Sequence, residues 1–254
     1  MARRRAMNAT KIKIVQVATR MFLERGYSST SVKAIAQELG ISTGNVTFYY
    51  PTKEHLLTVL VEMLCDFQWK MMQQTVEEGQ SSLMAVCLEL VAMAAICEEN
   101  PIAKDFYLSA YTNAMSLERI RRSDQRRARE VFSSYCPDWG EEYYAEAEVL
   151  VSGIEYATLM TTSASLSLDT RIAGGLNQIM TIYHVPEEIR AMKIRKVLAL
   201  DYGTIGRRIL REFMAYIDQV NEQAFDLFLQ TQNGTFETKS LSNLSQGGSN
   251  YESK

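Results

Sequence analysis

Long stretches of helical periodicity, with few helix-breaking residues between them, constrain the fold of this chain more than any other feature. The 254 residues contain only four prolines and thirteen glycines, too few for the closely spaced turns of a β-sandwich or β-barrel. Apolar residues make up 46% of the sequence, which is enough to form substantial buried cores. We therefore predict an all-α protein.

The N-terminal end of the chain contains several short helical segments. We predict helices over residues 10–25, 32–39 and 43–50, and a longer one from residue 52 towards residue 77. Gly26 and Gly40 are placed to end the first two, because glycine accepts the left-handed backbone that follows many helices. Ser31 is placed to cap the second helix and Ser42 or Thr43 the third, since a hydroxyl oxygen accepts a hydrogen bond from a free backbone amide.

The rest of the chain is predicted to form longer amphipathic helices. We place them at residues 82–99, 102–113, 116–135, 140–167, 171–183, 187–202 and 204–230. From about residue 232 the sequence is rich in Ser, Asn, Gly and Gln and has few apolar side chains to bury. We expect residues 232–254 to be disordered.

The net charge of -3 conceals two parts of opposite charge. Residues 1–60 hold nine basic and three acidic residues, a net charge of +6, whereas residues 61–254 hold eighteen basic and twenty-seven acidic residues, a net charge of -9. A basic N-terminal part on an acidic body is typical of a protein that places one end on a polyanion. Chance clustering of solvated charge is the alternative interpretation.

Several classes of protein are disfavoured. The four cysteines show no CxxC spacing, and His55 and His184 form no metal-ligand cluster with them, so we expect no metal and no cofactor. Neither histidine has an evident nucleophile and no phosphate-binding glycine loop is present, so we do not expect an enzyme. No stretch of about eighteen uncharged apolar residues predicts a membrane span, and no apolar signal core follows the basic N-terminus. We expect a cytoplasmic protein with reduced thiols and no membrane partner.

The second and third predicted helices have the features of a helix-turn-helix over residues 32–51. Such a motif needs a small residue where its helices cross, a residue tolerant of positive φ in the turn, and apolar residues that hold the pair together. Ala36 and Gly40 meet the first two needs. Ile35, Leu39, Ile41 and Val46 provide the apolar contacts. A helical hairpin without DNA binding is the alternative.

These residues belong to a longer pattern. It runs Ala18-x3-Phe22-x3-Gly26-Tyr27, then Ser31-Val32-x2-Ile35-Ala36-x3-Gly40-Ile41-Ser42-x-Gly44-x-Val46, then Tyr50-x2-Lys53-Glu54-x-Leu56-Leu57. Over residues 10–60 the chain resembles the N-terminal domain of the tetracycline-repressor (TetR/AcrR) family. The resemblance implies an all-helical homodimer, with a three-helix DNA-binding domain and a divergent helical body that dimerises and usually binds a small molecule. On this basis we predict a helix-turn-helix domain with a basic N-terminal arm at residues 1–55, and a ligand-binding and dimerisation domain at residues 56–231.

The resemblance also identifies candidate DNA-contacting residues. They are Ser31, Lys33, Ser42, Thr43, Gly44, Asn45, Thr47, Phe48, Tyr49 and Lys53. Of these, Ser31, Lys33 and Lys53 fall on backbone-gripping positions, and positions 43–45 and 47–49 fall on base-reading ones. Short polar side chains such as Thr43 and Asn45 at the start of a recognition helix reach base edges.

Some of these positions depart from the family pattern or leave alternatives open. At Thr47 the family usually has an aromatic residue, and at Tyr49 it often has His. Phe48 is expected either to face DNA, where it would pack on a thymine methyl or a sugar, or to turn inward as core. Residues 3–5, all Arg, form either a flexible arm that enters the minor groove or a solvated tail.

The body contains adaptable and aromatic side chains suited to a ligand chamber. Ten methionines and many tyrosines follow residue 60, and thioethers with aromatic walls favour an apolar or aromatic effector. We predict that the pocket is lined by Met93, Phe106, Tyr107, Tyr111, Tyr156, Met160 and Met180. The alternative is that these side chains form ordinary core.

Two further features of the body concern its surface. The apolar faces of segments 140–167 and 204–230 are predicted to pack against the same segments of a second copy as a four-helix interface. In segment 116–135, Arg119, Arg122, Arg126 and Arg129 lie opposite the apolar face and are expected to be solvated. Arg121 and Arg127 flank that face and are the better candidates for reaching inward.

The leading hypothesis is a dimeric repressor that a small molecule releases from a palindromic operator in double-stranded DNA. Two DNA-binding domains on sites about 34–36 Å apart supply the affinity and specificity that one recognition helix lacks. The alternative is a ligand-independent architectural or partner-interaction protein that binds DNA with the same fold.

Overall fold

A computed structural model describes residues 2–75, 82–160, 166–221, 223–225 and 228, with side chains from residue 9 onward. These residues form helices and no strand, which confirms the predicted all-α class. The helices are α1 (Ala2–Arg25), α2 (Val32–Leu39), α3 (Thr43–Tyr49), α4 (Lys53–Thr75), α5 (Ser82–Glu99), α6 (Pro101–Thr112), α7 (Ala114–Phe132), α8 (Glu141–Met160), α9 (Leu168–Ile182), α10 (Glu187–Leu198) and α11 (Tyr202–Gln219). Among the described residues, no helix is long and apolar enough to cross a membrane.

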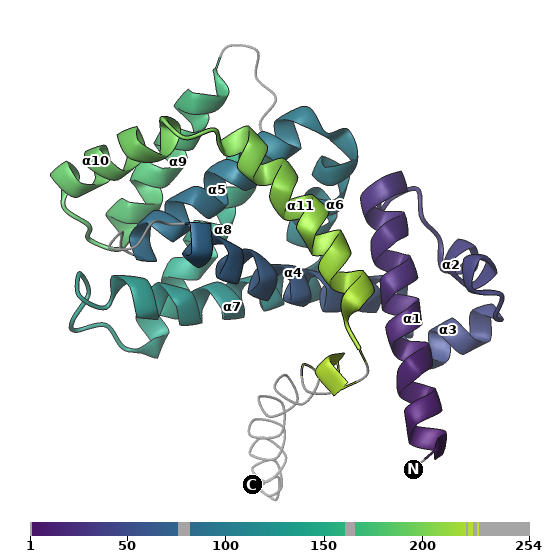
Figure 1. The fold of residues 1–254 in the computed structure, drawn as a ribbon. Helices are drawn as coiled ribbons and strands as arrows, with labels where there is room; N and C mark the ends of the chain where they lie inside the picture. The colour runs from purple at the N-terminus through teal and green to yellow at the C-terminus, as the bar shows by residue number, and fades with distance from the viewer. Residues whose placement is uncertain (1, 76–81, 161–165, 222, 226–227, 229–254) are drawn as a thin grey trace, which may run out of the picture.

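The chain has a small N-terminal group of helices and a larger helical body (Figure 1). Helices α1, α2 and α3 lie at one side of the molecule, and α4 leads from them into the body. Because α4 is continuous from Lys53 to Thr75, the predicted domain boundary after residue 55 falls within its first turn. One rigid helix therefore belongs to both parts.

Helix α5 forms the centre of the body. Thirteen of its eighteen residues are buried, and it contacts α4 and each of α6 to α11. This burial follows from its composition, because an apolar helix without a polar face is stable only when neighbours surround it. Helix α11 lies close to it at Gly206, where an added Cβ would lie 2.7 Å from the carbonyl oxygen of Ala92.

Several predicted segments differ from the observed helices. Helix α1 begins at Ala2, not at residue 10, so the backbone of residues 3–5 is helical and forms neither the flexible arm nor the disordered tail that were the two alternatives. Helices α8 and α11 end at Met160 and Gln219, short of the predicted ends at residues 167 and 230. The predicted disordered tail, residues 232–254, lies outside the described residues.

The predicted dimer surface on α11 is also wrong. Ile209, Phe213 and Ile217 are each 1% exposed or less, because α11 packs against α5, α1 and α4 of the same chain. The periodicity correctly identified an apolar face, but it did not indicate whether the covering helix belongs to the same chain or to a second copy.

Candidate nucleic-acid interface and body cavity

The turn between α2 and α3 is fixed by backbone hydrogen bonds at Gly40. This residue adopts φ +66° and ψ +28°, a left-handed conformation that favours glycine. Its amide donates to the carbonyl of Gln37, and the Ile41 amide donates to the carbonyl of Ala36 at 3.0 Å. This pair of bonds closes the end of α2 and sets the direction in which α3 leaves the turn.

Each helix of the motif begins with a serine cap. The Ser31 hydroxyl accepts from the Ala34 amide at 3.1 Å, and the Ser42 hydroxyl accepts from the Asn45 amide at 3.2 Å. Each hydroxyl keeps its hydrogen for a further acceptor, because the cap uses only its oxygen lone pair. Both serines are exposed, so phosphate oxygens can reach them.

Helix α3 has an inner and an outer face. Val46 and Tyr50 are buried on the inner face, and the Tyr50 hydroxyl donates to the carbonyl of Lys11 in α1 at 3.4 Å. On the outer face Thr43, Gly44 and Asn45 are exposed. The predicted reading positions at the start of α3 therefore point away from the protein.

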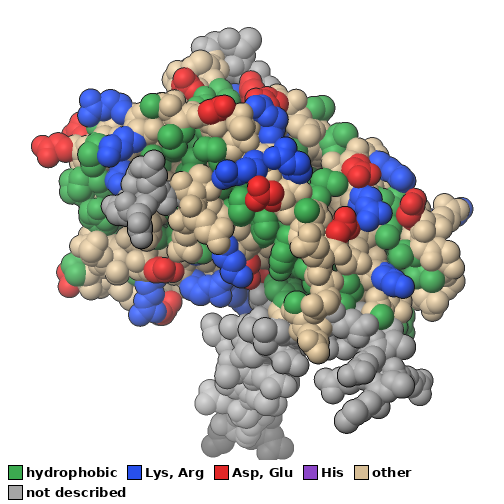
Figure 2. Space-filling view, in the orientation of Figure 1, with side chains coloured by type: hydrophobic (Ala, Val, Ile, Leu, Met, Phe, Trp, Pro, Cys, Tyr) green, Lys and Arg blue, Asp and Glu red, His purple; other side chains and the backbone are tan. Residues whose placement is uncertain are grey.

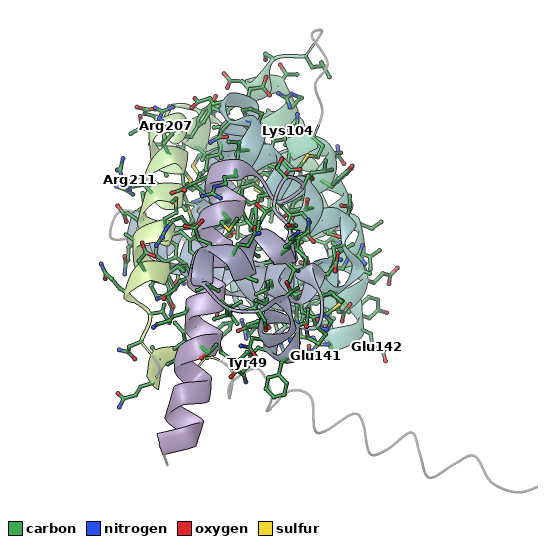
Figure 3. All side chains as sticks on the ribbon, turned by 90° about the vertical axis from the view of Figure 1, so that its right-hand side faces the viewer. Tyr49, Lys104, Glu141, Glu142, Arg207 and Arg211 are labelled. Atoms are coloured by element: carbon green, nitrogen blue, oxygen red, sulfur yellow. The ribbon has the colours of Figure 1, made fainter. Side chains whose placement is uncertain are left out.

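Phe48 is the most exposed large apolar side chain among the described residues, at 70%. Its ring lies edge-on to Tyr49 with the centroids 5.1 Å apart. Tyr49 is half-buried, and it lies at the opposite end of the molecule from Lys104 and Arg207 (Figure 3). Of the two placements considered for Phe48, the structure has the outward one.

Thr47 is half-buried and its hydroxyl is turned back to its own helix. Its Oγ1 donates to the carbonyls of Thr43 and Gly44 at 3.2 and 3.3 Å. The hydroxyl is therefore less available to DNA than those of Ser31 and Ser42.

Lys53 makes structural contacts within the protein that the sequence pattern did not indicate. Its ammonium group donates to the carbonyl oxygen of Tyr27 at 3.0 Å and lies 4.0 Å from the centroid of the Tyr27 ring. Burial, followed by the nearby Glu54 carboxylate, raises the pKa of Tyr27 to about 12, so the ring remains neutral. Lys53 thus ties the start of α4 to the loop that follows α1.

Two further connections join the N-terminal helices to the body. The Ser28 amide donates to the Asp105 carboxylate of α6 at 2.8 Å. The Gln16 side chain donates to the carbonyl of Ile217 at 3.1 Å, next to an Arg20–Asp218 ion pair at 3.1 Å. The N-terminal group of helices is therefore attached to the body through α4, α6 and α11.

The visible face of the molecule mixes charge signs. In Figure 2, basic and acidic side chains lie side by side over this face. Among the side chains drawn in colour, no continuous basic surface is visible on this face.

The body contains a cavity between α4, α5, α6, α7, α8 and the end of α9. It has about 70 Å³ of room for the centres of water-sized molecules, well above the roughly 10–15 Å³ that one water needs. Met93, Phe106, Tyr107 and Tyr111 line it as predicted. Tyr156, Met160 and Met180 do not line it: Tyr156 is 37% exposed, Met160 is half-buried, and Met180 is fully buried elsewhere in the core.

Charged residues line this cavity, and of these only Arg127 was expected to reach inward. Its walls include the carboxyl groups of Glu89, Asp124, Glu148 and Glu155, and the guanidinium of Arg127. Arg127 lies 3.4 Å from Glu89 and 3.3 Å from Asp124. The expectation that Arg127 reaches inward is confirmed, since it is 6% exposed.

Tyrosine hydroxyls pair with the other two carboxyl groups. The Tyr111 hydroxyl donates to Glu155 at 3.0 Å, and the Tyr183 hydroxyl donates to Oε1 of Glu148. Arg121 is half-buried and its Nε donates to the Ser152 hydroxyl at 2.9 Å. These bonds connect α6, α7, α8 and the end of α9 around the cavity.

Burial raises the pKa of every carboxyl group in the cavity wall. The pKa of Glu89 rises to about 7, and burial with the Asp124 carboxylate raises that of Glu148 to about 8. Burial also raises the pKa of Glu155 well above its usual range and raises the pKa of Asp124. Burial lowers the pKa of Arg127, but Glu89 and Asp124 outweigh it and the pKa rises. Arg127 stays charged.

The sequence did contain a signal for these acids. Glu89 is the one charged residue within the apolar segment 82–97. Glu148 and Glu155 are seven residues apart and share a helical face with Tyr144 and Val151, which are buried. Acids at apolar positions of a buried helix point to a polar cavity, because burying a charge alone is costly.

The predicted arginine stripe on α7 is mostly at the surface. Arg122, Arg126 and Arg129 are exposed, and each pairs with an acid: Glu118, Asp66 and Glu141. Arg119 is less exposed and pairs with Glu62 at 3.0 Å.

The geometry of α2, the Gly40 turn and α3 defines a helix-turn-helix of the DNA-binding class. Residues 14–60 match the sequence model of the family described as bacterial regulatory proteins, tetR family. The chain therefore has the N-terminal domain of the tetR family, as its sequence pattern indicated.

Similar proteins carry regulator names. The chain is 27% identical over 151 residues to the uncharacterized HTH-type transcriptional regulator YuxN of Bacillus subtilis (strain 168), covering 56% of this chain and 50% of YuxN. It is 27% identical over 109 residues to the HTH-type transcriptional regulator HbdR of Aromatoleum sp. (strain CIB), covering 43% of this chain and 46% of HbdR. Each match spans about half of the relative's length. Both names describe transcriptional regulators and not enzymes.

Among solved structures, the chain is similar to full-length tylp, a tetR regulator from Streptomyces fradiae. The TM-score is 0.46 at 18% identity, covering 82% of this chain and 99% of tylp.

Proposed function

We propose that this protein is a homodimeric transcriptional repressor whose α3 helices bind a palindromic operator, and that a small molecule in the body cavity releases it from DNA. The outer face of α3 is the observation on which this rests. Thr43, Asn45 and Phe48 are exposed there, while Val46 and Tyr50 hold the helix from inside. A large ring that is 70% exposed on a seven-residue helix has no role in the protein's own core.

The predicted contacts divide into two kinds. Ser31, Lys33, Ser42 and Lys53 hold the DNA backbone through hydroxyl and ammonium donors. The base edges are contacted by Thr43, Gly44, Asn45, Thr47, Phe48 and Tyr49. Since Thr47 bonds its own helix, Asn45 and Phe48 contribute most to base preference. Asn is suited to adenine, and the phenyl ring to a thymine methyl group.

The free face of α8 supports the homodimer. Tyr143, Val149, Leu150 and Tyr156 are exposed on this helix. A spacing of seven residues places Tyr143 with Leu150 along one line of the helix and Val149 with Tyr156 along a neighbouring line. Four such side chains on one helix form the kind of apolar surface that a second copy covers in a symmetric helical interface. In the proposed four-helix interface, each copy therefore contributes α8 and one neighbouring helix.

Release by a ligand is supported by the connections between the cavity and the DNA-binding helices. Helix α4 lines the cavity from Val61 to Trp69 and holds Tyr27 through Lys53 at its other end. Helix α6 lines it from Phe106 to Tyr111 and holds the loop after α1 through Asp105. A ligand that widens the cavity moves both helices, and so changes the separation of the two recognition helices.

The test is selection of binding sites from random double-stranded DNA, followed by titration of the selected site with the wild-type protein and with Asn45→Ala. We expect an inverted repeat with half-sites about one helical turn apart. The proposal would be refuted if no sequence were enriched. It would also be refuted if a single half-site were enriched and sedimentation showed that a monomer binds it. A selected site whose affinity no small molecule alters would instead favour the ligand-independent alternative.

A further inference from the structure

The charge of the body cavity is unusual for a chamber with mostly apolar walls. Four carboxyl groups face a single guanidinium, that of Arg127. Arg127 lies close to only two of the four, Glu89 and Asp124. The two remaining carboxyl groups, both on α8, accept hydrogen bonds from tyrosine hydroxyls.

Glu148 contains a buried oxygen that the protein leaves without a hydrogen bond. The residue is 2% exposed, and its Oε2 has no partner although Oε1 accepts from the Tyr183 hydroxyl. A buried polar atom without a partner destabilises the fold, because it has lost its hydrogen bonds to water. Since Glu148 lines the cavity, a donor placed in the cavity would remove this cost.

The chemistry of the walls excludes two classes of ligand. No group of three or more His, Cys, Asp or Glu among the described residues is arranged to hold a metal ion. Once these carboxyl groups are ionised, above their raised pKa values, an anion would meet four carboxylates and one arginine, and like charges in a cavity of low dielectric repel strongly. The aromatic rings of Trp69, Phe106 and Tyr107 in the same wall instead suit a cation with an apolar body.

We infer that this cavity binds an organic ammonium ion, a protonated amine on a small apolar or aromatic body, whose N–H group donates to Oε2 of Glu148. The inference builds on the proposed function by naming the chemical class of its effector. It changes the sequence-based expectation of an apolar or aromatic ligand by adding a positive charge.

The titratable groups around the cavity make binding dependent on pH. They are Cys65 and Asp66 on α4, Glu89 on α5, Tyr107 and Tyr111 on α6, Arg121, Asp124 and Arg127 on α7, Glu148 and Glu155 on α8, and Tyr183 after α9. An ammonium ion pairs with ionised carboxyl groups, and burial keeps these protonated at low pH. Binding therefore releases protons and strengthens as the pH rises.

The experiment is isothermal titration calorimetry on the full chain with 2-phenylethylammonium chloride. Two control compounds of similar shape differ from it in charge: 2-phenylethanol is neutral and 3-phenylpropanoate is anionic. An alkylammonium resembles the lysine side chain, whose pKa is about 10.4, and so stays cationic up to pH 8.5. We expect the cation to bind at least tenfold more tightly than either matched probe, with affinity more than tenfold higher at pH 8.5 than at pH 6. Equal or tighter binding of the neutral or anionic probe would overturn the inference.

Glu148→Gln and Glu146→Gln form a matched pair on α8. Glu146 is exposed two residues before the buried Glu148, so its substitution removes the same charge outside the cavity. We expect Glu148→Gln to weaken binding of the cation at least tenfold and Glu146→Gln to change it less than twofold. Glu155→Gln provides a second cavity variant if Glu148→Gln does not fold. Equal effects of the cavity and surface variants would refute the assignment.

Calorimetry without DNA separates this inference from the proposed function. If the cation binds but the affinity for the selected operator is unchanged, the cavity assignment stands and release by a ligand fails. If the neutral probe releases the operator and the cation does not, release stands and the inference fails.

Discussion

Lys53 offers the sharpest test of how the DNA-binding helices are built, because two roles for it predict different measurements. Its ammonium group bonds the Tyr27 carbonyl at 3.0 Å and lies 4.0 Å from the centroid of the Tyr27 ring. We propose that it also contacts a DNA phosphate, since one of its three donors serves Tyr27. Lys53→Met removes the charge and keeps most of the apolar stem.

The magnitudes follow from these contacts. A hydrogen bond from a charged donor contributes about 1.5–3 kcal/mol, and a cation–π contact at a partly exposed site about 0.5–1 kcal/mol. Partial exposure of Lys53 places the total near the lower end. We expect Lys53→Met to reduce the free energy of unfolding by about 2 kcal/mol. Loss of a phosphate contact should reduce the slope of log affinity against log salt by about 0.9 for each DNA-binding domain.

Urea unfolding and fluorescence anisotropy at several salt concentrations measure the two effects separately. Lys33→Met, at an exposed position, should reduce the salt slope with little loss of stability. Lys70→Met, near the other end of α4 and exposed, should change neither. If Lys53→Met lowers stability and leaves the slope unchanged, the phosphate role is wrong and Lys53 only positions α4. If stability is unchanged, the contact with Tyr27 carries no energy.

Three further results are expected. Asn45→Ala should weaken operator binding by about 1–3 kcal/mol and relax base preference, and Phe48→Ala should weaken it without lowering the urea midpoint; a fall in stability would show that Phe48 belongs to the core. Gly206→Ala should destabilise the fold by about 1–3 kcal/mol, because the added Cβ meets the Ala92 carbonyl. Gly174→Ala, whose added Cβ has no atom within 4 Å, should instead stabilise α9 by up to about 1 kcal/mol. Urea unfolding measures both changes, and equal effects would contradict the packing of α11 on α5. Burial raises the pKa of Glu148 to about 8, so its contribution to stability is fully present below the pKa of the unfolded chain, near 4.3, and is lost as the pH rises towards 8. Glu148→Gln should therefore flatten the pH dependence of the unfolding free energy between these two values. An unchanged profile would show that Glu148 does not cause this pH dependence.

The local features of the DNA-binding helices were predictable because their determinants are close together in sequence. Gly40 adopts a positive φ, and Ser31 and Ser42 cap the helices that follow them. Each of these outcomes depends on a backbone group within a few residues. By contrast, Lys53 was predicted as a phosphate contact only, because its bond to Tyr27 joins residues 26 positions apart.

The cavity was predictable only in part, for the same physical reason. Periodicity shows which helix face is apolar, and that is sufficient to place Phe106 and Tyr107 near the centre of the body. It does not show which buried faces meet around a space and which pack tightly. Met180 is fully buried but lies outside the cavity wall. Glu148 occupies an apolar position and forms part of that wall.

The geometry of α4 gives the scale of the proposed release. From Lys53 to Trp69 the helix covers sixteen residues, or about 24 Å at 1.5 Å per residue. Trp69 lies at the cavity and Lys53 holds the loop after α1. A helix tilt of about 5° over that length displaces its far end by about 2 Å, comparable to the small helix shifts that switch other regulated proteins. In a symmetric dimer both recognition helices move, so the change in their separation is larger than the displacement of either one. An ammonium ion that enters between Glu148 and the aromatic wall needs to widen the cavity only slightly, because α4 converts the widening into movement at the DNA.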